Sequence, residues 1–221
     1  MQIVIYVSHV DDEILGAGGL IAQMVEAEHD VHVVYATDAS SPRTSGVDKR
    51  PQAEAATEVL GLSPNSLHFL GITEMEFDDV PVIELNRRFD ALDLEPDIVI
   101  TNSKHDVNQD HNQVFESARV IGRSIDKQIG ILTCEIISSA EWGDVPFDPS
   151  FYVDISETVE QKVEAMCEVD TELREWPHPR SPKGIRTKAQ QRGMEVGYEY
   201  AEAYRVVRWF DFDEPLAPTE P

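Results

Sequence analysis

Short apolar runs rich in β-branched residues alternate along this chain with longer segments of helical periodicity, and this alternation limits the possible folds more than any other feature. The clearest apolar runs cover residues 3–7, 31–35, 66–70, 97–101 and 131–137. Helix-patterned segments lie between them, at residues 14–28, 52–60, 82–92 and 111–124. Strand–helix–strand alternation with almost continuously apolar strands is typical of a parallel sheet covered on both faces. We therefore predict a Rossmann-like α/β layer over residues 1 to about 140.

The pattern changes in the last third of the chain. Residues 151–155 resemble one more strand, and Ser156 is placed to cap a helix that ends near Val169. A further helix is predicted from about Lys183 to Val207, after a break at two prolines. We interpret these elements as a C-terminal strand and helix extension of the mostly parallel sheet.

The chain length fits one domain with a sizeable core. Of its 221 residues, 41% are apolar, which is enough for a packed interior. We predict a single domain over residues 1–210 and a poorly ordered acidic tail over residues 211–221. The apolar run near the N-terminus follows no basic cluster and is too short for a signal peptide or a membrane span.

Acidic residues far outnumber basic ones. The 42 Asp and Glu residues stand against 18 Lys and Arg residues, which gives a formal net charge of −24. Nucleic acids and anionic membranes both require a basic surface, so neither is expected as a partner. We interpret the acidity as a solvated surface, and a high-salt host, which would screen the repulsion, is a hypothesis about habitat only. Cys134 and Cys167 lie in apolar-patterned segments and are predicted to be reduced core residues of a soluble, cytoplasmic protein.

Two clusters of histidines and acids directly follow predicted strands. The first is Ser8-His9-Val10-Asp11-Asp12-Glu13, and the second ends in Asp106-Val107-Asn108-Gln109-Asp110-His111. Both lie beyond the carboxyl ends of strands, where open α/β sheets build their sites. Two imidazoles and a carboxylate from such loops form a nitrogen and oxygen donor set suited to Zn²⁺, and three protein ligands leave one position open for water. The sequence therefore predicts a catalytic metal site.

Other interpretations of these clusters explain less. Asp11, Asp12 and Asp110 could cap helices, but capping does not account for the histidines beside them. A calcium loop starting at Asp106 would need glycine at its sixth position and glutamate at its twelfth, where the chain has His111 and Ser117. A dinucleotide fingerprint also fails, because the glycines at positions 16, 18 and 19 fall inside the helix pattern.

The first cluster, together with Gly16, resembles the HPDDE signature of the PIG-L/LmbE-like metal-dependent deacetylases, with Val10 in place of the usual proline. Residues 106–111 resemble the second signature of that family. The likeness covers nearly the whole chain except the tail. It extends to residues 138–139, 141–142, 151–156, 177–181, 192–193 and 200–203.

The resemblance implies roles for individual residues. His9, Asp12 and His111 would bind Zn²⁺, although Fe²⁺ could occupy the same ligands. Asp11 would be the general base, because a carboxylate beside the metal can take a proton from water and deliver it to the leaving amine. Asp110 would orient a histidine by accepting its other ring N–H, and helix capping remains the alternative for this residue.

One position departs from the family pattern. Many members carry a histidine three positions before the last ligand, where it stabilises the oxyanion, and here that position is Asn108. Asn108 can donate a hydrogen bond but cannot supply a positive charge. His178, between two prolines, is our candidate for the missing cation, and the alternative is an exposed loop histidine.

The expected substrate follows from the resemblance alone. Family members remove acetyl groups from N-acetylglucosamine units on varied aglycones, so we predict a zinc-dependent deacetylase of an N-acetylated amino-sugar conjugate. Lys49 or Arg50 falls roughly where the family places a sugar-binding arginine, with poorly fitting spacing, and Arg180 and Arg192 are alternatives. The competing functions are hydrolysis of another small-molecule amide and sugar binding without turnover. The aglycone, the resident metal and the oligomeric state, a homo-oligomer included, are open at this stage.

Overall fold

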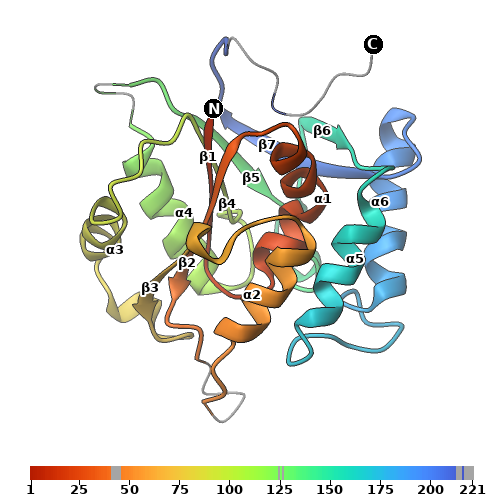
Figure 1. The fold of residues 1–221 in the computed structure, drawn as a ribbon, viewed down its shortest axis with the longest axis horizontal. Helices are drawn as coiled ribbons and strands as arrows, with labels where there is room; N and C mark the ends of the chain where they lie inside the picture. Colours follow the sequence, from red (N-terminus) through yellow and green to blue (C-terminus); the bar gives the residue numbers. More distant parts are fainter. Residues whose placement is uncertain (41–45, 124, 126, 213–215, 217–221) are drawn as a thin grey trace.

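Seven strands form a single sheet in the computed structural model, which describes residues 1–40, 46–123, 125, 127–212 and 216 (Figure 1). The order across the sheet is β3-β2-β1-β4-β5-β7-β6. Neighbouring strands from β3 to β5 pair in parallel, whereas β7 is antiparallel to both β5 and β6. The strands are β1 Gln2–Val7, β2 Asp30–Thr37, β3 Leu67–Ile72, β4 Ile98–Thr101, β5 Gly130–Cys134, β6 Phe151–Asp154 and β7 Ala201–Arg208.

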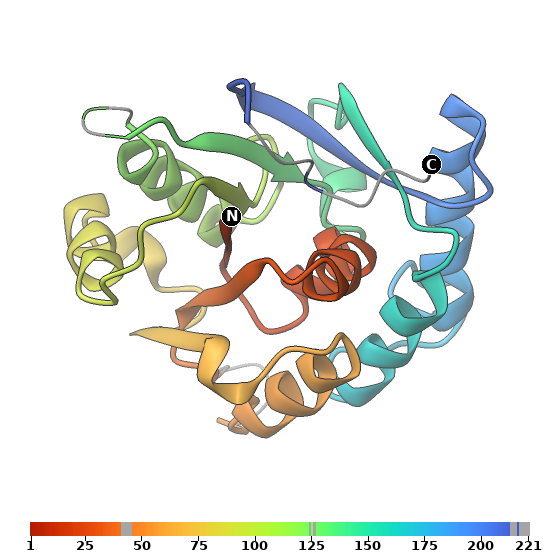
Figure 2. The same cartoon turned by 45° about the horizontal axis from the view of Figure 1, so that its top comes forward.

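Helices cover both faces of the sheet, and two apolar cores lie beneath them. In Figure 2 the yellow-green helices α3 and α4 stand on one side of the sheet, and α1, α2, α5 and α6 stand on the other. This arrangement confirms the predicted Rossmann-like fold. The helices are α1 Asp12–Glu26, α2 Arg50–Val59, α3 Val82–Asp90, α4 Gln109–Ile121, α5 Val159–Glu168 and α6 Pro182–Val196.

Glycines allow α1 to approach the sheet unusually closely. A Cβ atom added at Gly16 would lie 2.5 Å from Sγ of Cys134, and one added at Gly19 would lie 2.7 Å from a methyl carbon of Ile155. Real Cβ atoms do not come so close to other heavy atoms, so the depth of α1 requires residues without a Cβ at both positions. This depth matters for the site, because α1 begins at Asp12.

The C-terminal region differs from the sequence prediction. The predicted helix to Val207 is wrong, because α6 ends at Val196, Gly197 takes the left-handed conformation at φ 88°, and β7 follows. Gly197 is a helix-ending residue in the usual C′ position, but the Ala- and Glu-containing segment after it also suits a helix by propensity. The predicted cap at Ser156 is wrong as well. Thr158 precedes α5, and the Ser156 hydroxyl donates to Asp154 instead.

Three further expectations concern single residues and the tail. Cys134 is buried, but Cys167 is exposed and is therefore not a core residue; both thiols are free. Most of the predicted tail lies outside the described residues, although Phe212 within them packs against the core. Among the described residues, the helices are all too short or too polar to cross a membrane.

Candidate active site

The two histidine-containing loops meet where the strand order reverses. From β1 the chain proceeds outwards to β2 and β3, whereas β4, on the other side of β1, leads to β5. The loops after β1 and β4 therefore flank a crevice at the carboxyl end of the sheet, which is where open α/β folds bind ligands. His9 comes from the first loop, Asp12 opens α1, and His111 lies in the first turn of α4.

Three donor atoms form a nearly equilateral triangle in this crevice. His111 Nε2 lies 3.3 Å from both His9 Nδ1 and Asp12 Oδ2, and the remaining side is 3.5 Å. Tetrahedral coordination with bonds of about 2.0–2.1 Å places neighbouring ligand atoms about 3.3–3.4 Å apart. The triangle thus matches three of the four corners of a tetrahedral zinc site. These are the three residues whose ligand atoms could together hold a metal ion within the described part of the chain.

A carboxylate lies on the far side of each imidazole. Asp110 Oδ2 lies 2.8 Å from Nε2 of His9, and Asp106 Oδ2 lies 3.0 Å from Nδ1 of His111. Asn102 additionally donates to Asp12 Oδ2 at 3.2 Å. Carboxylate–histidine pairs of this kind fix the ring orientation and the tautomer of a metal-binding histidine. The ring nitrogens that remain face one another across the triangle.

The site has a strongly negative potential. Burial lowers the pKa of both histidines, but Asp110 and Asp12 outweigh this effect at His9 and raise its pKa to about 10. Asp12 and Asp106 likewise outweigh burial at His111 and raise its pKa to about 9. A potential that retains protons on two buried imidazoles equally favours a divalent cation between them. The donor set, its spacing and its charge therefore all fit a metal ion.

Asp11 lies beside the donor triangle in a constrained backbone conformation. Its φ of 124° is rare for a residue other than glycine, and its backbone N–H donates to Glu13 Oε2 at 3.1 Å. Its Oδ2 accepts a hydrogen bond of 2.9 Å from Arg180 Nη1, so Oδ1 is the oxygen left for other contacts. Burial and the charge of Asp12 raise the pKa of Asp11 to about 7, and Arg180 opposes this shift.

A cleft of about 650 Å³ opens above the metal-site residues, which is within the size range of small-molecule sites. Asp11, Asn108 and the three candidate ligands line it. Asn108 caps α4, since its Oδ1 accepts from the backbone N–H of Asp110 at 3.0 Å, and the donor hydrogens of its amide take no part in this cap. Met75, Val107 and Trp142 contribute apolar surface to the same cleft.

His178 lies on the loop between α5 and α6 and does not line the cleft. Its Nδ1 accepts a hydrogen bond of 3.1 Å from the backbone N–H of Arg180. Partial burial and the guanidinium groups of Arg180 and Arg174 lower the pKa of His178, which disfavours the charged form. The oxyanion role predicted for His178 thus has no support from its position, whereas Asn108, the other predicted candidate, and Arg180 both line the cleft.

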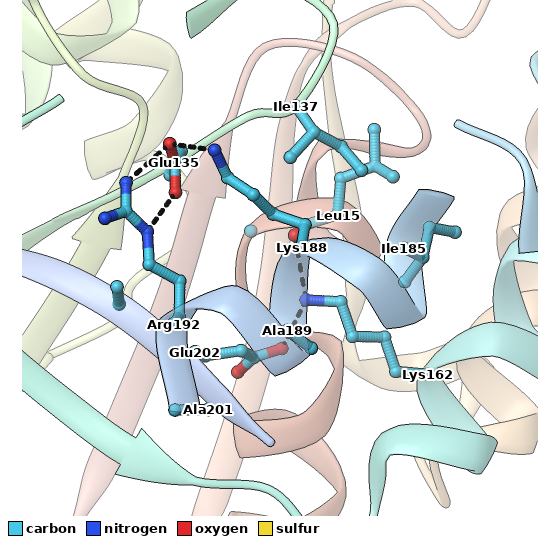
Figure 3. Close-up of a pocket in the computed structure, with 12 residues that line it drawn as sticks. Leu15, Glu135, Ile137, Lys162, Ile185, Lys188, Ala189, Arg192, Ala201 and Glu202 are labelled. Atoms are coloured by element: carbon cyan, nitrogen blue, oxygen red, sulfur yellow. Dashed lines mark hydrogen bonds and ion pairs between the residues drawn. The ribbon is translucent and has the colours of Figure 1, made fainter. Parts of the chain in front are cut away.

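The other predicted arginines lie away from the cleft. Arg50 is exposed, with its guanidinium over the ring of Phe69, and the neighbouring Lys49 lines the cleft instead. Arg192 forms a bidentate ion pair with Glu135 at 2.8 and 2.9 Å. Figure 3 shows this pair, with Lys188 also directed at Glu135, beside a separate small cavity next to α6.

Two acids of the site were not among the predicted site residues. Asp106 was recognised as part of the second cluster but was given no role, although an acid five residues before a helix-start ligand can reach the far nitrogen of that ligand. Glu172 lies in the α5–α6 loop, and it accepts from Arg180 at 2.6 Å and from Lys49 at 2.9 Å. Because these partners come from distant parts of the chain, local sequence held no signal for Glu172.

The fold is of the Rossmann-like α/β class, and the His–Asp–His group is a candidate site for one metal ion. Residues 4–121 match the family model of PIG-L, described as GlcNAc-PI de-N-acetylase, and the chain belongs to this family. The protein is therefore an enzyme of the N-deacetylase class, which hydrolyses a linear amide. No curated protein matches the chain in sequence.

Several solved structures share the fold at low sequence identity. The N,N'-diacetylchitobiose deacetylase from Pyrococcus horikoshii is 18% identical, with a TM-score of 0.71 over 93% of this chain and 83% of that one. The A40926 pseudoaglycone deacetylase Dbv21 is 17% identical, with a TM-score of 0.74 over 95% and 98% of the two chains. The 4-carboxy-2-hydroxymuconate hydratase GalB from Pseudomonas putida KT2440 is 20% identical, with a TM-score of 0.69 over 97% of this chain and 100% of that one.

Proposed function

We propose that the protein removes the acetyl group from an N-acetylated amino-sugar conjugate, with Zn²⁺ held by His9, Asp12 and His111. The observation that carries this proposal is the donor triangle with sides of 3.3–3.5 Å beside the free carboxylate oxygen of Asp11. When bound, a divalent cation at this position polarises an amide carbonyl and lowers the pKa of a coordinated water. Fe²⁺ suits the same donors.

The chain's own residues provide the proton transfer. Asp11 takes a proton from the attacking water at Oδ1 while Arg180 holds Oδ2, and it then passes that proton to the sugar nitrogen as the C–N bond breaks. The products are acetate and the free amine. Asn108 lines the cleft two residues from the Asp110 carboxylate, and we assign its amide N–H to the developing oxyanion.

Related structures support an amino-sugar substrate. One of the neighbours is a deacetylase of diacetylchitobiose and another acts on the pseudoaglycone of A40926. The hydratase among them indicates that this fold also hosts addition of water to a substrate without an amide. Acetate release therefore has to be measured directly rather than inferred from the disappearance of a substrate.

The test is a screen of N-acetylated sugar conjugates for acetate release, with and without a chelator. We expect release from at least one conjugate, its loss after chelation and its recovery after addition of Zn²⁺. Release that persists in a protein shown by elemental analysis to be metal-free would contradict the metal assignment. Release from simple N-acyl amides, but from none of the sugars, would favour hydrolysis of another small-molecule amide.

A further inference from the structure

Three exposed apolar side chains surround the mouth of the candidate active site. Met75, Val107 and Trp142 are 54%, 53% and 67% exposed, and all three line the cleft that contains the metal-site residues. Single exposed apolar residues are ordinary on protein surfaces. Three of them on one cleft, in a chain with a net charge of −24, offer an apolar ligand a surface to contact. We call these three residues the apolar rim.

The apolar rim is fixed to the metal site. The backbone N–H of Met75 donates to Asp110 Oδ2 at 2.8 Å, and Asp110 is the carboxylate that orients His9. Val107 directly follows Asp106, the carboxylate beside His111. Trp142 ends a short 3₁₀ helix that begins after Ser139, whose hydroxyl donates to Asp106 at 2.7 Å. The backbone that carries the rim is thus anchored to the residues of the metal site, which limits the entropy lost on binding.

The cations of the cleft are already paired. Lys49 Nζ lies 3.0 Å from Glu74 and 2.9 Å from Glu172, and it is almost fully buried. Arg180 Nη1 lies 2.9 Å from Asp11 and 2.6 Å from Glu172.

The third cation, Arg174, is held less tightly. It donates to the backbone carbonyls of Thr171 and Leu173 and lies 3.8 Å from Glu172. Among the described residues that line the cleft, Lys49 and Arg180 thus form close ion pairs with carboxylates, although Nε of Arg180 has no hydrogen-bond partner, and Arg174 is the cation most exposed to a ligand. The acidic surface further repels anions on approach.

We propose that the cleft accepts an amino sugar joined to an uncharged, apolar aglycone, which the apolar rim contacts, and that it discriminates against sugars joined through a phosphate. This inference rests on the proposed deacetylase function. We expect Trp142 to be the main determinant of the preference for an apolar aglycone, because an indole ring offers the largest flat apolar surface for an aromatic or aliphatic group. Glu172 is the second determinant, because its carboxylate forms ion pairs with both Lys49 and Arg180.

The test compares three probes with the zinc-loaded, full-length protein. They are 4-nitrophenyl N-acetyl-β-glucosaminide, free N-acetylglucosamine and N-acetylglucosamine 1-phosphate. We expect kcat/KM for acetate release to be about tenfold higher for the aryl conjugate than for the free sugar. We expect it to be about 100-fold higher for the aryl conjugate than for the phosphate.

Two variants separate the determinants. Trp142→Ala should reduce the preference for the aryl conjugate over the free sugar about tenfold, mainly through KM. Trp176→Ala is the matched control, because this tryptophan is 51% exposed, packs on Lys183 and lies outside the cleft; the preference should stay unchanged. Glu172→Gln should raise the rate on the phosphate relative to the aryl conjugate. Comparing two substrates within one variant cancels any general loss of activity.

The outcomes distinguish the two levels of the proposal. Equal rates on the aryl and phosphate conjugates, or a Trp142→Ala variant with an unchanged preference, would overturn the aglycone inference and leave the deacetylase function standing. No acetate from any of the three probes would overturn the proposed amino-sugar function, and the aglycone inference with it.

Discussion

Two regions of this molecule bury many charges, and they arrange them differently. In the C-terminal ion-pair cluster, made of Glu135, Lys162, Arg192 and Glu202, each charge meets an opposite one directly. Lys162 Nζ lies 2.6 Å from Glu202, and Arg192 donates two hydrogen bonds to Glu135. In the candidate metal centre, three donor atoms from His9, Asp12 and His111 converge, with distances of 3.3–3.5 Å between them.

The difference shows what identifies a functional site among buried charges. The side chains of both regions are mostly buried, and in each region carboxylates raise the pKa of one cationic group, His111 in the metal centre and Arg192 in the ion-pair cluster. A closed ion pair satisfies its own charges, whereas two histidines and a carboxylate that converge on one point provide the ligands for a cation. The four predictions below test this contrast, from the largest expected effect on turnover to the smallest.

The largest effect is expected from removal of a donor. His111→Ala should reduce metal content from about one equivalent to a small fraction and lower acetate release about 10³-fold or more, because the charge that polarises the amide is lost. Elemental analysis and acetate assays measure the two quantities. His68→Ala, on β3 and paired with His32, is the matched control and should retain both. A His111→Ala protein that keeps its metal would remove this residue from the ligand set.

Asp11→Asn should distinguish a general base, whose loss lowers kcat, from a metal ligand, whose loss also lowers metal content. We expect metal content to stay near one equivalent while kcat falls roughly 10²–10⁴-fold, the usual contribution of a general base. The same metal analysis and acetate assay apply. Near-normal turnover would exclude Asp11 from the mechanism, and loss of metal together with turnover would indicate a ligand role.

The oxyanion assignment is tested by two variants measured side by side. Asn108→Asp keeps a good cap for α4 but removes the amide N–H, so kcat should fall roughly 10²–10³-fold with the helix intact. His178→Ala should change kcat little, because His178 does not line the cleft. If His178→Ala strongly lowered kcat while Asn108→Asp left it unchanged, the oxyanion role would belong to His178, as predicted from the sequence.

The smallest effect on turnover is expected in the C-terminal ion-pair cluster. Lys162→Met leaves the Glu202 carboxylate buried beside Tyr204 without its cation, so the free energy of unfolding should fall by about 3–5 kcal/mol. Urea denaturation measures this loss, and kcat per folded molecule should be unchanged. A variant of normal stability with lowered kcat would show that the cluster takes part in the chemistry, and the contrast drawn above would fail.

The sequence predicted the parts of the fold that depend on local patterning. Parallel strands buried on both faces produce continuous apolar runs, so β1 to β5 and the helices between them were located within a few residues. The strand β7 was missed for a physical reason. It pairs with β5 and β6, which are distant in the sequence, and its own residues allow a helix equally well.

In the candidate site too, some residues could be predicted from the sequence and others depend on contacts between distant elements. His9, Asp12 and His111 follow strand ends, so their convergence could be predicted from topology. Glu172 and Arg180 reach the cleft from the α5–α6 loop, and their meeting with Asp11 depends on packing between distant elements. Arg192 was predicted to bind the substrate, but its charge is paired with Glu135. The sequence spacing of the two residues does not reveal this pairing.

The close packing of α1 has a consequence for ion selectivity. Asp12 is the first residue of α1, and the contact between Gly16 and Cys134 one turn later fixes the depth of the whole helix. A methyl group at position 16 would force the helix or the strand to move by some tenths of an ångström, and the Asp12 carboxylate would move with it. Donor triangles with longer sides suit larger ions, whose bonds exceed the 2.0–2.1 Å of zinc. We therefore expect the preference for one metal over another to depend partly on an apolar contact outside the ligand set. Competition between Zn²⁺ and Mn²⁺ in Gly16→Ala would measure it, and an unchanged ratio would show that the loop absorbs the shift.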